Sequence, residues 1–242
     1  KPMATTLADA REMLDVAERR DGFLQIGYEM RYSKLYQKVK EWVDHGHLGQ
    51  VINTQCTYLC SEFHGKASWR NQKSGGSMFG LKLCHYVDYP RWLIGSRVKD
   101  VHSVCAPNIV RYKEVHDNYH TTCRFENGAV SHLTFMMGPA ASLSNDPLRD
   151  NQAQQKGDGH ELRILVVGTK GAAETDVFGR RIKRWEFGDS PERMTSAWVE
   201  DLTWPEAEDH FYFHNTTAQA HDIVRRVAKG LPPMTPVLDS FE

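Results

Sequence analysis

The chain has no excess of either charge and no long hydrophobic run. Its 242 residues include 30 lysines and arginines against 31 aspartates and glutamates, a formal net charge of −1. Nucleic acids and anionic membranes recruit strongly basic surfaces, so neither is an expected partner. The chain also lacks a signal-peptide pattern and an apolar run of about 18 residues that could cross a membrane. A small molecule is therefore the expected partner.

Cysteine is scarce and does not form a recognisable set. The five cysteines are an odd number, and none belongs to a CxxC pair. They lie within apolar or alternating runs, which favours reduced, buried thiols and a cytoplasmic location. His210, His214 and His221 are the nearest approach to a metal-binding group, but their spacing matches no closed ligand set and no HExxH is present. We therefore expect no metal site.

The first quarter of the chain alternates helix and strand patterns. Apolar residues at helical spacing predict a helix over 6–21, with Thr6 as its cap. The apolar run at 23–28 predicts a strand, and a helix followed by a strand is typical of the closing unit of an α/β layer. The next helix carries the apolar stripe Leu35, Val39, Trp42 and Val43, and a strand is expected at 51–60.

The remainder of the chain is dominated by strands. A helix ends near Gly95, and Asn127 and Gly128 mark a hairpin because both tolerate positive φ. The polar stretch 142–159 is either a mobile loop or lid, or a plain disordered insertion. Thr216 and Gln219 offer a capping box for a last helix over 216–229. The expected strands are 98–105, 118–125, 129–136, 162–167, 172–177 and 182–187.

This order of elements predicts an α+β fold. The expected architecture is one broad, mostly antiparallel, open-faced sheet with helices on one face, preceded by a remnant of an α/β layer. A sheet with one uncovered face is a natural surface for forming homo-oligomers.

The segment 75–95, GGSMFGLKLCHYVDYPRWLIG, contains the best candidates for chemistry. Lys82 and His85 are three residues apart, so on one helix they share a face about one turn apart. A cation beside an imidazole can lower its pKa, which suits a proton-handling pair. The alternative is an ordinary half-buried histidine and a solvated lysine, and the spacing alone does not decide between them.

Several motifs in order give this segment a context. The chain opens with Lys-Pro and continues with GYEMRY (27–32), HGHLGQV (45–51), WR (69–70) and KLCHYVDYPRWLIG (82–95). In that order and at those distances the chain resembles the glucose-fructose oxidoreductase and inositol dehydrogenase (Gfo/Idh/MocA) family of NAD(P)-dependent enzymes. The resemblance implies that 1–28 are a remnant of a dinucleotide-binding domain and that 29–242 form a substrate-binding and oligomerisation sheet domain. It also implies NAD or NADP as cofactor and a sugar or polyol as substrate.

The resemblance assigns roles to the residues around the helix. His85 resembles the family's proton acceptor, and Lys82 matches a branch with a Lys-x-x-His motif. Lys1 resembles the motif lysine that approaches the nicotinamide and the reacting hydroxyl, with Pro2 beside it at the cofactor. Many members carry an acid where this chain has Leu81. Asp88, three residues beyond His85, could orient the ring instead, although a helix-surface carboxylate is an equal alternative.

Further substrate contacts are expected outside this helix. Tyr28 and Arg31 follow the predicted strand, where α/β crevices receive ligands. Trp69 and Arg70 could line a sugar-sized pocket through a flat apolar face and a hydroxyl-directed guanidinium. The alternatives are packed aromatic residues without a role in binding.

The chain also departs from the family. It has no GxGxxG, the turn that places a pyrophosphate at a helix N-terminus, and its Lys-Pro looks like the end of a motif late in the dinucleotide domain. By this interpretation it is a fragment that binds nicotinamide poorly and is inactive alone. Two other functions fit the same residues: an NAD-dependent glycosidase that acts by oxidation, elimination and reduction, and a non-catalytic binding or scaffold protein.

Overall fold

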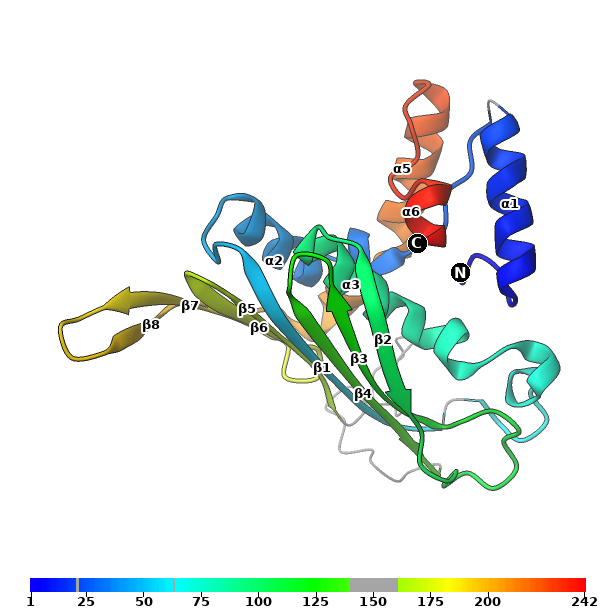
Figure 1. The fold of residues 1–242 in the computed structure, drawn as a ribbon, viewed down its shortest axis with the longest axis horizontal. Helices are drawn as coiled ribbons and strands as arrows, with labels where there is room; N and C mark the ends of the chain where they lie inside the picture. Colours follow the sequence, from blue (N-terminus) through cyan, green and yellow to red (C-terminus); the bar gives the residue numbers. More distant parts are fainter. Residues whose placement is uncertain (21, 63, 140–160) are drawn as a thin grey trace.

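A computed structural model describes residues 1–20, 22–62, 64–139 and 161–242 (Figure 1). An eight-stranded sheet forms its centre, in the order β2-β3-β4-β1-β5-β6-β7-β8. The β1–β4 pair is parallel and the other pairs are antiparallel, so the predicted broad, mostly antiparallel sheet is confirmed. The strands are β1 (Val51–Ser61), β2 (Val98–Val104), β3 (Asn118–Phe125), β4 (Val130–Gly138), β5 (Glu161–Gly168), β6 (Gly171–Asp176), β7 (Arg181–Asp189) and β8 (Met194–Thr203).

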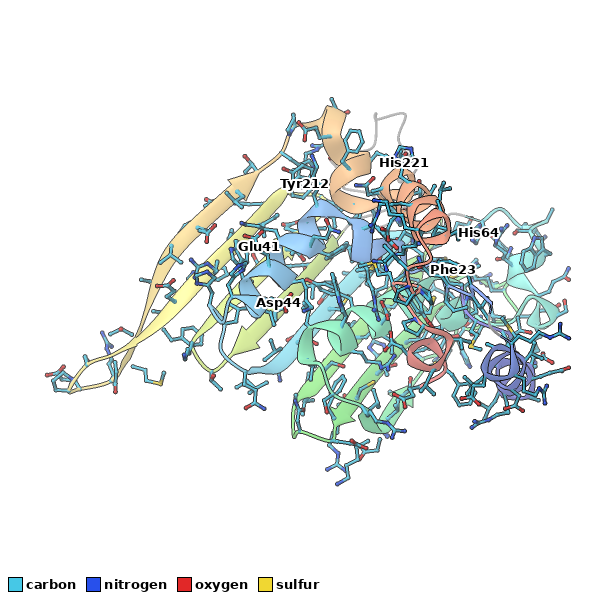
Figure 2. All side chains as sticks on the ribbon, turned by 90° about the horizontal axis from the view of Figure 1, so that it is seen from above. Phe23, Glu41, Asp44, His64, Tyr212 and His221 are labelled. Atoms are coloured by element: carbon cyan, nitrogen blue, oxygen red, sulfur yellow. The ribbon has the colours of Figure 1, made fainter. Side chains whose placement is uncertain are left out.

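The helices occupy two places around the sheet. Helices α2 (Lys34–Asp44) and α3 (Cys84–Ile94) cover one face, while α1 (Leu7–Arg19), α5 (Thr216–Ala228) and α6 (Val237–Phe241) stand together beside it (Figure 1). The short α4 (Asp209–Phe213) packs against α2. Seen from above, Glu41 and Asp44 lie on α2 over the sheet (Figure 2), where they pair with lysines of the same helix. No helix in the described ranges is long and apolar enough to cross a membrane.

The core lies between the sheet and these two helices. Cys56, Tyr58 and Cys60 alternate along β1 toward the helices, as the period of two along a strand requires, and all three are at most 2% exposed. Tyr58 packs against Tyr86 of α3 with ring centroids 5.4 Å apart. The apolar stripe of α2 meets the same layer, with Trp42 2% exposed. The helix carrying the candidate residues is therefore held on a rigid support.

Two predicted features of the fold are wrong, and one strand was not predicted. Residues 23–28 do not form a strand, because none of the described strands pairs with them. The cap of α5 is Asn215, whose side chain accepts a hydrogen bond from the Ala218 backbone amide, rather than Thr216. Strand β8 was not predicted, because most of its side chains are exposed and its sequence shows no alternation. The predicted loop at 142–159 lies outside the described residues.

Segments 23–28 and 234–235 meet although they are far apart in sequence. The Gln25 side chain accepts a hydrogen bond from the Met234 amide at 2.7 Å, and the Thr235 hydroxyl donates to the Ile26 carbonyl at 2.5 Å. Side chains thus satisfy backbone groups that a sheet partner would otherwise satisfy. This link brings the C-terminal region close to Tyr28 and Glu29.

A substitution at Gly168, at the end of β5, would test how tightly the sheet packs against the loop after α2. A Cβ at this buried glycine would overlap the backbone carbonyl of Leu48, which cannot rotate away. We expect Gly168→Ala to lower the free energy of unfolding by about 1–3 kcal/mol, the usual cost of overpacking. Urea unfolding measures this. Gly65→Ala is the matched control, because no atom lies within 4 Å of its Cβ position; equal effects would contradict the packing described.

Candidate active site

The candidate site begins at an irregular turn before α3. Residues Phe79–Leu83 form a π-helical turn, a departure that is frequent at functional sites. Lys1 donates from Nζ to the Leu81 carbonyl at 2.8 Å. The position where many members of the resembled family carry an acid thus contributes its backbone to Lys1. This contact places the side-chain ammonium of Lys1 one turn before His85.

His85 lies in the first turn of α3 and is 1% exposed. Its Nε2 is 3.1 Å from Glu29 Oε1, and the edge of its ring faces Tyr28 with centroids 6.0 Å apart. The Glu29 contact is too poorly aligned for a hydrogen bond, and neither ring nitrogen has a hydrogen-bond partner within the described ranges. A buried polar group left without a partner requires an explanation, and a substrate hydroxyl would supply one.

Glu29 is the site residue that sequence reasoning missed. It begins the 3₁₀ turn Glu29–Tyr32 and lies between two imidazoles. The Nδ1 of His214 is 3.0 Å from the same Oε1. His214 is 185 positions away along the chain, so no spacing rule connects them. The only signal was that Glu29 follows Tyr28 within a motif already singled out.

Burial governs the protonation of the two histidines. It lowers the pKa of His85 to about 4, although nearby Glu29 opposes this, and Lys1 and Lys82 add to the lowering. It also lowers the pKa of His214 to about 4, against the hydrogen bond with Glu29. Burial alone would raise the pKa of Glu29, but the His214 and His85 contacts outweigh it and hold that pKa well below its ordinary value. At neutral pH both rings are neutral and the carboxylate is charged.

Lys82 lies in the π-helical turn that precedes α3, while His85 lies in α3 itself. The Nζ of Lys82 is 5.8 Å from the centre of the Tyr58 ring. Its charge depresses the pKa of both His85 and His214. The site therefore combines one carboxylate, two neutral imidazoles and the ammonium groups of Lys1 and Lys82, which suits the transfer of a proton away from a hydroxyl.

Asp88 and Arg31 do not reach His85. Arg31 donates to both oxygens of Asp88, at 2.9 and 2.6 Å, and also to Asp239 of α6 at 2.9 Å. Arg31 and Asp88 are each at most 5% exposed. The structure therefore places Glu29, rather than Asp88, beside the His85 ring, because the Asp88 carboxylate is taken up by a buried ion pair.

Of the other residues predicted to contact substrate, Tyr28 lies beside His85, whereas Trp69 and Arg70 form a separate pair. Tyr28 is buried beside His85, and burial is the main cause that raises its pKa. Trp69 is 54% exposed and carries the Arg70 guanidinium 4.6 Å above its ring. Their turn is anchored by Asn71, which accepts a 2.6 Å hydrogen bond from buried Lys113. Within the part of the chain that the structure describes, the Trp69–Arg70 pair is not brought to His85.

The described residues hold no group of three or more histidines, cysteines or carboxylates that could bind a metal. Of the three late histidines, His214 faces Glu29 and His210 faces the Thr217 hydroxyl at 3.3 Å. All five cysteines are free thiols; three are buried, and Cys84 and Cys105 are partly exposed.

The two buried histidines predict a pH-dependent stability. Their pKa in the fold is about 4, against an ordinary value of about 6.5, so the unfolded chain binds more protons between these limits. The free energy of unfolding should therefore fall as pH drops from about 6.5 to 4, on the order of 1 kcal/mol per pH unit for each histidine. Urea unfolding across this range should show for His214→Asn roughly half of the total slope that the wild-type chain shows. The exposed His47→Asn control should keep the wild-type slope, and identical slopes for all three would contradict the assignment.

The buried ion pair gives a second prediction. Asp88→Asn leaves the Arg31 guanidinium buried without its main partner, so we expect the free energy of unfolding to fall by about 3 kcal/mol. Asp100→Asn is the matched control, because Asp100 makes the same two-pronged contact with Arg124 on the surface. Solvent screens that pair, and its loss should not move the urea midpoint measurably. An equal shift for both variants would contradict a structural role for Asp88.

The chain is similar to several known proteins in sequence and in fold. An inositol 2-dehydrogenase of Streptomyces avermitilis is 24% identical over 222 residues, 87% of this chain and 61% of that protein. The oxidoreductase YrbE of Bacillus subtilis is 26% identical over 180 residues, 73% of this chain and 47% of that protein. The match spans less than two thirds of each relative. A levoglucosan dehydrogenase solved with NADH and levoglucosan has the same fold, with a TM-score of 0.73, 21% identity, and coverage of 100% of this chain and 66% of that one.

The family itself is identified by a domain model. The GFO/IDH/MocA C-terminal domain matches residues 36–174, which is more than half of the chain. The matched range contains α2, β1, α3 and the strands on either side of β1, and it includes Lys82 and His85. Strands β1 to β5, helix α3 and the candidate proton acceptor thus lie within one recognised domain, and the chain belongs to the GFO/IDH/MocA family.

Proposed function

We propose that the chain is the substrate-binding part of an NAD(P)-dependent oxidoreductase that removes a hydride from a hydroxyl-bearing carbon of a sugar or polyol. The observation that carries the proposal is His85, a buried imidazole without a hydrogen-bond partner among the described residues, beside two ammonium groups in a member of this family. Relatives described as inositol dehydrogenases, and a structural neighbour solved with levoglucosan, support the substrate class.

The residues of this chain would perform the proton half of the reaction. The neutral His85 ring accepts the hydroxyl proton, and its low pKa returns the proton readily to solvent. Lys1 and Lys82 stabilise the negative charge that develops on the hydroxyl oxygen. Tyr28, Trp69 and Arg70 are proposed as substrate contacts.

The chain suits only the reacting end of the cofactor. Lys1 and Pro2 lie against the turn before His85, where Pro2 Cγ is 3.4 Å from the position of a Cβ on Gly80. These two residues would contact the nicotinamide, which accepts the hydride when bound. No GxGxxG is present to hold the pyrophosphate. We therefore propose that residues 1–28 are a remnant of the dinucleotide-binding domain and that the chain alone is inactive.

The outer face of the sheet supports a proposal of homo-oligomers. The described helices leave this face open (Figure 1). The neighbouring hairpin β7–β8 presents exposed apolar side chains, with Met194 67% and Trp198 54% exposed. Apolar patches of this kind are typical of interaction surfaces. We propose that a second copy of the chain covers this face of the sheet. The proposed location of the protein is the cytoplasm.

Activity is tested on the complete gene product that contains this chain. With NAD⁺ or NADP⁺ and a panel of inositols, anhydrosugars and aldoses, we expect reduced nicotinamide to form with at least one substrate. His85→Asn should lower kcat roughly 10²- to 10⁴-fold, the usual contribution of a general base. Lys82→Met should lower it by a smaller factor, since Lys1 remains.

The exposed His47→Asn serves as the control and should keep the wild-type rate. Full activity of His85→Asn would contradict the proposal, as would the absence of reduced nicotinamide with every substrate. Release of sugar from an aryl glycoside without net reduction of the cofactor would instead favour the eliminative glycosidase.

A further inference from the structure

A buried group of three side chains comes from separate parts of the chain: Glu29, His85 and His214. One oxygen of Glu29 is 3.0 Å from Nδ1 of His214 and 3.1 Å from Nε2 of His85. The Glu29 side chain is 14% exposed, and the two histidine side chains are at most 7% exposed. A single carboxylate therefore faces both rings with little competition from water.

The charges define which ring nitrogens carry protons. An ionised carboxylate only accepts hydrogen bonds, and the contacts with the two rings keep Glu29 ionised. Nδ1 of His214 hydrogen-bonds to this oxygen, so it is the protonated nitrogen of its ring. Nε2 of His85 lies 3.1 Å from the same oxygen, where the carboxylate attracts an N–H and repels a lone pair, so Nε2 is the protonated nitrogen of the His85 ring. The remaining nitrogen of the neutral His85 ring, Nδ1, then holds a lone pair.

We propose that Glu29 is a positioning residue that holds His85 with its proton on Nε2 and its lone pair on Nδ1, and that His214 acts through Glu29 by fixing its carboxylate. The inference rests on the proposed oxidoreductase function. In the proton step the substrate O–H bond breaks and an N–H bond forms at His85 Nδ1. The resulting imidazolium lies against the Glu29 carboxylate, which stabilises its positive charge as the acid of a catalytic triad does.

The backbone supports this arrangement. Ser33, just after the turn that begins with Glu29, donates from its hydroxyl to the Phe213 carbonyl at 2.5 Å. The same hydroxyl lies 3.2 Å from the Glu29 carbonyl. Ser33 thus joins the backbone on both sides of the Glu29–His214 contact, and the carboxylate is oriented before any substrate arrives.

Kinetics of the complete gene product provide the first test. Glu29→Gln keeps the shape of the side chain and removes its charge, so we expect kcat to fall on the order of 10²-fold with little change in KM. Glu41→Gln on the surface of α2 is the matched control and should leave kcat unchanged (Figure 2). A Glu29→Gln kcat within twofold of wild type would overturn the proposal.

Substitutions of His214 separate positioning from packing. His214→Asn retains an N–H near the position of Nδ1, whereas His214→Leu retains bulk without a donor. We expect the asparagine variant to keep most of the wild-type kcat and the leucine variant to lose roughly as much as Glu29→Gln. Equal rates for the two variants would contradict the proposed role.

Nitrogen NMR of the labelled 242-residue chain tests the arrangement without any activity. At neutral pH we expect His85 as the Nε2–H tautomer and His214 as the Nδ1–H tautomer, each assigned by comparison with its asparagine variant. In Glu29→Gln the His85 tautomers should mix. If the wild-type rings show other tautomers, the inference fails even for an active enzyme. If the tautomers are as stated and the complete protein reduces no nicotinamide, only the proposed function fails.

Discussion

The structure depends on pairing the polar side chains of one buried turn, Glu29–Ser33. Unpaired polar groups at such depth are costly, and each finds its partner in another element. Arg31 pairs with α3 and α6, and Ser33 and Glu29 pair with the end of α4. These contacts tie the start and the end of the chain to α3, and they position its first turn.

The same constraint explains the charges of the candidate site. Burial alone would raise the pKa of the Glu29 carboxylate, but its contacts with two imidazoles keep it ionised. The histidines stay neutral because burial outweighs the attraction of a single carboxylate. The neutral His85 ring is the form that the proposed proton transfer requires, and keeping it buried and neutral lowers stability in mild acid. The Arg31–Asp88 ion pair has no proposed part in the proton transfer. It holds the Glu29–Ser33 turn against α3.

Local patterns predicted most elements, because they depend on neighbouring residues alone. The Asn127–Gly128 hairpin and the helix with the Leu35 and Val39 stripe both follow from local pattern. Two errors have one cause: the run at 23–28 looked like a strand and β8 did not, because pairing depends on which neighbours the fold supplies. The ion pair of Asp88 with Arg31 was not predicted for a similar reason, since the position of Asp88 near His85 in sequence gave no information on Arg31.

The sequence by itself determined the α+β class, the broad antiparallel sheet, and the ordered motifs that identify the family. They follow from the hydrophobic periodicity, the turn residues and the order of the motifs, all of which can be recognised from neighbouring residues in the sequence. Only the tertiary structure decided that Glu29 and His214 meet at His85, that Leu81 receives Lys1 through its backbone, and that Asp88 belongs to an ion pair. Such contacts join residues up to 185 positions apart. They form because buried polar groups must be satisfied by whatever partners the packed helices and sheet bring within reach.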